Sequence, residues 1–321
     1  MRAEFEIFGK ELDGSAIHQN STSWLLAPGC LLAYYPPVVS FPKVILLLAV
    51  TLGCATNCFA HGEVHTRINQ LTAEIAQTPT NASLYFQRAE LYRVDQDFTN
   101  ALADLDRVAK ADLSIVRVDF CRGRVLFEAG RPQEALVPLN KYLAGKPKDG
   151  EAFTTRARVL AKVGNHKAAT EDYTQAIALS VGGNPELYIE RADAFRAMGK
   201  TDEAIRGLDE GIRKMGPLVT LQLPAIDLEV SSKRYDAALA RIDQVSARLQ
   251  RKETWLVRRA EILIKAGREE EAKKNYREAL AAIDRLPAGH RGTRAMLELR
   301  ARIHAAQGTN APAANAVLSP R

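Results

Sequence analysis

The apolar positions of the chain recur in a fixed pattern that predicts short helices joined in pairs. In the first helix of most pairs, a small residue is followed three positions later by a large apolar one and, four positions further on, by a glycine. Apolar residues at helical spacing indicate one buried face, and a glycine can adopt the left-handed geometry that ends a helix. The large residues are Tyr92, Leu126, Leu160, Phe195 and Leu263, and the glycines are Gly130, Gly164, Gly199 and Gly267.

The second helix of each pair carries an alanine whose spacing reveals an internal repeat. These alanines are Ala101, Ala135, Ala169, Ala204, Ala238 and Ala272, at intervals of 34, 34, 35, 34 and 34 residues. Twelve residues before each lies another, mostly small, residue: Ala89, Gly123, Ala157, Ala192, Ile226 and Ala260. A period of this length predicts an array of helical hairpins that stack on one another.

This pattern resembles the tetratricopeptide repeat family, whose signature combines small residues at positions 8, 20 and 27 of a unit with aromatic residues at positions 4, 11 and 24. The resemblance covers six units in residues 81–289 and implies an all-α fold, a right-handed α-solenoid of about six helix-turn-helix units. Small residues let the two helices of a unit approach closely where they cross. We expect this packing role for Ala89, Ala101, Gly123, Ala135, Ala157, Ala169, Ala176, Ala192, Ala204, Ala238, Ala260, Ala272 and Ala279.

The fifth unit departs from the pattern. Ile226 stands at the small position, and Glu229 stands where a large apolar residue belongs. Pro224 lies well inside the expected first helix. Because proline has no backbone N–H and its ring clashes with the preceding turn, we expect this helix to be kinked or shortened.

Amphipathic segments flank the six units. We expect residues 61–80 and residues 290–307 to form terminal helices that cap the array, since a solenoid exposes apolar surface at both ends. Residues 308–321 are rich in alanine, asparagine and proline and predict a disordered tail.

Residues 38–60 have the layout of a secretory signal peptide. Lys43 precedes an apolar run from Val44 to Leu52, and small and polar residues then lead to a cleavage site after Ala60. The sequence therefore predicts an exported protein of bacterial type, delivered to the periplasm.

Two alternatives to cleavage remain open. The apolar run could stay as a membrane anchor, although it has nine residues where a spanning helix needs roughly 20. Cys54 could carry a lipid, because the preceding residues are similar to a lipoprotein box. Residues 1–37 form an atypical acidic leader, and whether they are translated is a question that the sequence leaves open.

A row of arginines directly precedes the small residue of the first helices. Such a row could bind nucleic acid, but no aromatic residues for base stacking alternate with it. The constant phase favours a structural role instead, in which Arg88 pairs with Asp104 and Arg156 with Asp172. We therefore expect no nucleic-acid partner. The row consists of Arg88, Arg122, Arg156, Arg191 and Arg259.

No motif for catalysis, a metal or a cofactor stands out. The chain has no glycine-rich phosphate loop and no Gly-x-Ser-x-Gly motif, and no histidine near Cys121 could activate its thiol. His61 and His65 lie one helical turn apart but have no third ligand nearby, and the glutamate between them is misplaced for a zinc protease. We expect a protein that is not an enzyme and that binds no cofactor or metal.

The resemblance implies a concave surface, formed by the first helices, that holds a segment of another protein. The matching positions combine arginines, which pair with carboxylates, with phenylalanines, which could bury an apolar anchor. We therefore expect a non-catalytic scaffold or adaptor whose partner is acidic with an apolar anchor. The alternative is a membrane-tethered structural subunit of a cell-envelope assembly. The expected groove residues are Arg117, Phe120, Arg124, Phe127, Arg158 and Lys162.

Overall fold

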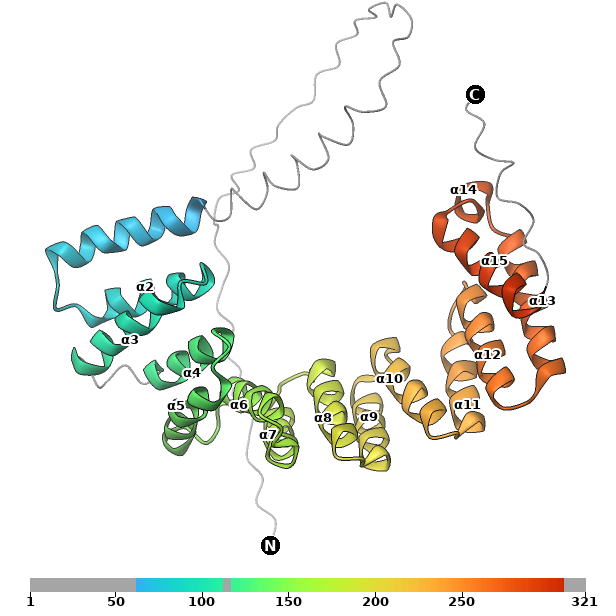
Figure 1. The fold of residues 1–321 in the computed structure, drawn as a ribbon, viewed down its shortest axis with the longest axis horizontal. Coiled ribbons are helices and arrows are strands. Elements are labelled where there is room, and N and C mark those ends of the chain that lie inside the picture. The colour runs from blue at the N-terminus through green and yellow to red at the C-terminus, as the bar shows by residue number, and fades with distance from the viewer. Residues whose placement is uncertain (1–61, 112–116, 309–321) are drawn as a thin grey trace, which may run out of the picture. The chain divides into compact units, whose positions relative to one another are not determined.

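The structure is a computed structural model that describes residues 62–111 and 117–308. Within these residues every regular element is a helix (Figure 1). A helix over residues 62–77 comes first. It is followed by α2 (Ala82–Val94), α3 (Phe98–Ala111), α4 (Val118–Glu128), α5 (Pro132–Gly145), α6 (Gly150–Lys162), α7 (His166–Leu179), α8 (Pro185–Ala197), α9 (Thr201–Met215), α10 (Val219–Ser231), α11 (Tyr235–Ser246), α12 (Glu253–Lys265), α13 (Glu269–Asp284), α14 (Ala288–Arg291) and α15 (Arg294–Ala306).

The helices from α2 to α13 form successive hairpins. The two helices of each hairpin pack together, and the second helix of one hairpin contacts the first helix of the next. The order runs from the pair α2–α3 to the pair α12–α13 (Figure 1). The described part of the chain thus confirms the all-α solenoid of about six helical units.

Caps and turns fix where the helices begin and end. Asn81, Asp149 and Asn184 each accept a hydrogen bond from a backbone N–H in the first turn of α2, α6 and α8. At the end of α4, Gly130 has φ = 75°, and the next residue's N–H bonds back to the carbonyl of Leu126 at 2.9 Å. The expected glycine turns are confirmed; in the first and fifth units, Gln96 and Lys233 adopt the same left-handed geometry.

The small residues expected at the helix crossings are all buried. Gly123 shows why they must be small. A Cβ atom placed on Gly123 would lie 2.5 Å from Cγ of Leu139 in the partner helix α5, and Leu139 is itself completely buried. Close approach of the two helices therefore depends on the missing side chain.

The first helix of the fifth unit is not shortened, so that part of the expectation is wrong. Helix α10 has 13 residues, the same number as α2, α6, α8 and α12. Pro224 is the sixth residue of α10, so the missing N–H affects only a bond to the carbonyl of Thr220 in the first turn. Glu229 is buried but receives a hydrogen bond of 2.7 Å from Arg241.

Terminal helices cover the apolar ends of the hairpin array. The helix over 62–77 buries Ile68, Leu71 and Ile75, and Thr72 in it accepts a hydrogen bond from Arg88 at 2.9 Å. At the other end, α15 packs against α12 and α13 through Met296, Leu299 and Ile303.

The predicted leader, signal peptide and most of the predicted disordered tail lie outside the described residues. Among the helices that are described, none is long and apolar enough to cross a membrane.

Candidate interaction surface

Each arginine of the row pairs with an acidic residue of a neighbouring helix. Arg88 donates two hydrogen bonds to Asp104, at 2.7 and 2.9 Å, and Arg156 donates two to Asp172, at 2.7 and 2.8 Å. Both expected pairs are confirmed, and this bidentate geometry is the strongest that arginine forms with a carboxylate. The remaining members each donate one hydrogen bond to a carboxylate. Arg191 of α8 pairs with Glu210 of α9 within a hairpin, whereas Arg122 of α4 pairs with Asp106 of α3, and Arg259 of α12 with Asp243 of α11, across the junction to the preceding unit.

A second set of ion pairs joins the first helices of successive units. Arg124 of α4 pairs with Glu90 of α2 and, at 3.3 Å, with Glu151 of α6. Arg158 of α6 pairs with Glu190 of α8 at 2.8 Å. We call the surface that carries these pairs the first-helix face; its central row is Glu90, Arg124, Arg158, Asp193, Asp227 and Glu261.

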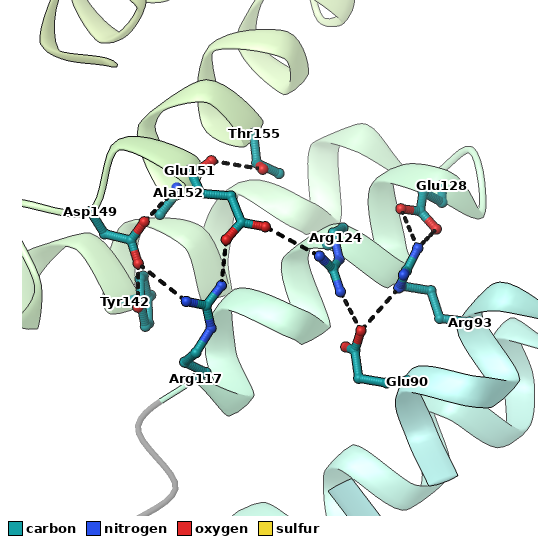
Figure 2. Close-up of polar contacts among 10 residues, drawn as sticks. All are labelled: Glu90, Arg93, Arg117, Arg124, Glu128, Tyr142, Asp149, Glu151, Ala152 and Thr155. Atoms are coloured by element: carbon teal, nitrogen blue, oxygen red, sulfur yellow. Dashed lines mark hydrogen bonds and ion pairs between the residues drawn. The ribbon is translucent and has the colours of Figure 1, made fainter. Parts of the chain in front are cut away.

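Over the first three units these pairs merge into one polar chain (Figure 2). Each arginine in it stands between two carboxylates, so the charge of each arginine is neutralised within the protein. The chain runs through Tyr142, Asp149, Arg117, Glu151, Arg124, Glu90, Arg93 and Glu128 (Figure 2).

Tyr142 and Asp149 anchor one end of the polar chain. The Tyr142 hydroxyl donates a hydrogen bond of 2.6 Å to Asp149, whose other oxygen accepts the N–H of Ala152 and so caps α6. Burial and this hydrogen bond raise the pKa of Tyr142 to about 12. Burial alone would raise the pKa of Asp149, but the hydrogen bonds from Tyr142 and Ala152 outweigh it and lower that pKa.

Cys121 lies beneath the polar chain as a buried thiol. Its residue surface is 3% exposed, and burial, with the nearby charge of Glu90, raises its pKa to about 12. A thiol with such a pKa is protonated at neutral pH, whereas the nucleophile is the thiolate. Cys121 therefore fills space in the core and is not prepared for catalysis.

The structure brings some of the predicted groove residues together and separates others. Arg124 and Arg158 line one cleft of about 650 Å³, with Thr154 and Thr155 between them. Arg117 does not line this cleft; it pairs at 2.6 Å with Glu151, which does. Lys162 is exposed at the end of α6, outside that cleft, and Phe127 is half-buried against the core of the first two units.

The structure contradicts the prediction that Phe120 lines the groove. Its side chain is completely buried, with the ring centre 5.5 Å from that of Tyr142 and the Arg117 guanidinium 4.7 Å above it. Tyr142 from the second helix covers the ring, so Phe120 is a core residue and cannot serve as an apolar anchor for a partner.

Sequence reasoning missed a second cleft, which lies between α8 and α10. It has a volume of about 450 Å³, with Ile189, Leu223, Pro224 and Leu228 among its lining residues. Leu223 is 40% exposed and adds apolar surface to this cleft. The only signal in the sequence is the irregular fifth unit, where Pro224 predicts a kinked or shortened helix and not a cleft.

Metal-binding geometry is absent from the part of the chain that the structure describes. No three side chains of histidine, cysteine, aspartate or glutamate there are placed to hold an ion. His65 lies 3.5 Å from Asp95, while His61 is outside the described residues.

Comparison with known proteins places this geometry among helical repeats. Residues 86–150 and residues 256–283 match family models described as tetratricopeptide repeat. The chain is 28% identical over 133 residues to human tetratricopeptide repeat protein 16; the match covers 37% of this chain and only 15% of that relative's length.

Two solved structures align with most of the chain. One is the C-terminal part of a repeat-containing protein from Cytophaga hutchinsonii, with a TM-score of 0.56 and 13% identity over 74% of this chain and 96% of that chain. The other is a tetratricopeptide repeat protein from Parabacteroides merdae, with a TM-score of 0.48 and 18% identity over 77% of this chain and 96% of that one. At these identities the likeness concerns the fold alone.

Proposed function

Because the chain is a tetratricopeptide repeat protein, we propose that it is a non-catalytic scaffold that binds a segment of another protein along its first-helix face. Proteins of this repeat family generally mediate protein–protein interaction and are generally not enzymes. The observation that carries the proposal is the pair of clefts on this face, one beside Arg124 and Arg158 and the other between α8 and α10.

The acidic partner that the sequence predicts would bind through an exchange of ion pairs. Arg124 and Arg158 already pair with Glu151 and Glu190, so a partner's carboxylate has to displace a glutamate of the chain itself. Exchanging one exposed pair for another changes the free energy little, since such pairs contribute about 0–1 kcal/mol each. The acidic partner stays a prediction. If it binds by this exchange of ion pairs, its carboxylates contribute little affinity at the cleft of the second and third units.

Photo-crosslinking in the cells that make the protein tests the scaffold function. A benzoylphenylalanine replaces Thr155, which lines the cleft of the second and third units, or, as a control, Val137, which is 72% exposed on the second helix α5. We expect the full chain to form an adduct with a different protein from position 155 and none from position 137. Equal adducts from both positions, or none from either, would contradict a partner on the first-helix face.

We also propose export of the mature chain, with cleavage after Ala60. The support is the sequence of residues 38–60 alone. Mass spectrometry of the chain isolated from its host distinguishes the outcomes. A mature N-terminus at His61 supports export, whereas an acylated Cys54 or an intact apolar segment supports the membrane-tethered alternative.

A further inference from the structure

The ion pairs along the first-helix face are interrupted at one junction. An arginine bridges the first two units, another bridges the third and fourth, and Arg258 of α12 pairs with Asp227 of α10 to bridge the fifth and sixth. Between the fourth and fifth units the central row instead places two acids, Asp193 and Asp227. In the described part of the chain no ion pair joins α8 to α10.

The cleft between α8 and α10 occupies this junction. Ile189 and Leu228 are apolar residues of its wall, and Leu223 and Pro224 add apolar surface from the first half of α10. Leu223 remains 40% exposed, so its side chain is accessible to a partner. A volume of about 450 Å³ is large enough for an apolar side chain together with part of its backbone.

The two acids at this cleft retain unused hydrogen-bonding capacity. The side chains of Asp193 and Asp227 are each 60% exposed. Arg196 donates only to Oδ1 of Asp193, and Arg258 donates only to Oδ1 of Asp227. Within the described residues, the second oxygen of each carboxylate accepts no hydrogen bond, although a carboxylate group can accept several.

We infer that this cleft seats an apolar side chain of the partner that is flanked by lysine or arginine. The inference rests on the proposed scaffold function and assigns it a partner chemistry. Burial against Leu223 and Ile189 supplies affinity, and the partner's cation takes the place of the arginine that bridges the other junctions. An acidic segment is disfavoured here, because the arginine that lines the cleft, Arg196, is already paired with Asp193, and a partner's carboxylates would face Asp193 and Asp227.

Two short peptides test this partner chemistry on the full chain. Both are capped at their ends, carry fluorescein and contain one leucine, flanked by lysines in Ser-Lys-Leu-Lys-Ser and by glutamates in Ser-Glu-Leu-Glu-Ser. We expect fluorescence anisotropy at low salt to show about fivefold tighter binding of the lysine peptide, because two exposed ion pairs distinguish it from the other. The preference should fall at high salt, which screens exposed charges.

Matched variants locate the binding. The double variant Asp193→Asn with Asp227→Asn should lose the preference for lysine, and Leu223→Ser should weaken the lysine peptide at least about threefold. Leu297→Ser is the control, since Leu297 is 47% exposed on α15, away from the cleft. Circular dichroism checks that each variant is folded.

Several results would overturn the inference. These are equal affinity for both peptides, tighter binding of the glutamate peptide, a preference that survives in the double variant, and equal effects of Leu223→Ser and Leu297→Ser. If neither peptide binds but a Thr155 adduct forms, this cleft is not the binding site, and the proposed scaffold function is still supported. Absence of that adduct would remove the function itself.

Discussion

Adding one methyl group at Gly123 tests whether the hairpins depend on close helix crossing. In Gly123→Ala the new Cβ would lie 2.5, 2.8 and 3.2 Å from three carbon atoms of the Leu139 side chain. Carbon atoms in favourable contact are roughly 3.5–4.0 Å apart. Leu139 is completely buried, so its side chain has no free space to move into. The helices α4 and α5 must therefore separate, or Leu139 must leave its preferred rotamer.

Two opposing effects set the expected size of the change. Overpacking a core costs about 1–3 kcal/mol. Alanine is favoured over glycine inside a helix by about 1 kcal/mol, which offsets part of that cost. Gly207→Ala serves as the matched control, because its Cβ would lie 3.5 Å from the nearest atom, Nη2 of Arg191, in ordinary contact. We expect Gly207→Ala to be stabilising and the two variants to differ by about 1–3 kcal/mol.

Urea denaturation of both variants, followed by far-ultraviolet circular dichroism, gives the two free energies of unfolding. Their difference removes the helix-propensity effect that both share and leaves the steric cost at the crossing. If Gly123→Ala and Gly207→Ala stabilised the protein equally, the close crossing of α4 and α5 would not hold and our explanation of the small residues would be wrong.

Three further predictions follow from buried polar groups. Arg88→Met leaves the carboxylate of Asp104, which is 1% exposed, with only Arg107, and should lower the free energy of unfolding by about 3 kcal/mol in urea denaturation; an unchanged value would contradict the role of the pair. Burial raises the pKa of Glu229 above its ordinary value of 4.5, so the folded protein holds the Glu229 proton more tightly than the unfolded chain does. This contribution to the free energy of unfolding is complete below pH 4.5 and is lost as pH rises through the folded-state pKa. The stability of Glu229→Gln relative to the unmodified protein should therefore improve from pH 4 to pH 7, and a pH-independent difference would refute this. Iodoacetamide at pH 8 should leave Cys121 unmodified in the folded chain and modify it in urea, as read by peptide mapping, because its pKa is about 12; rapid reaction in the folded state would contradict its burial.

The hairpins could be predicted because their causes are local. The small residues keep one phase for about two hundred residues, and an interaction such as that of Arg88 with Asp104 spans only 16 positions within one unit. Such contacts recur with the repeat and are visible in the sequence. The six units, the pairs of Arg88 with Asp104 and of Arg156 with Asp172, and the glycine turns can therefore all be predicted from the sequence.

The interaction surface was less predictable because it depends on contacts between units. Phe120 occupies a position that faces the groove in the repeat family, yet Tyr142 and Arg117 cover it in this chain. The sequence predicts Arg124 as a groove residue that pairs with a partner's carboxylate, but glutamates on both neighbouring units neutralise it. A charge of opposite sign one repeat length away, as in Glu90 and Arg124, was the available signal for this ladder. The cleft beside Leu223 had no such signal.

Amide hydrogen exchange of the full chain, with and without the partner isolated through the Thr155 adduct, tests the central claim most directly. A partner on the first-helix face should slow exchange in α4, α6, α8 and α10 and leave α5, α7, α9 and α11 unchanged. Protection confined to the second helices, or no protection in any first helix, would contradict the account.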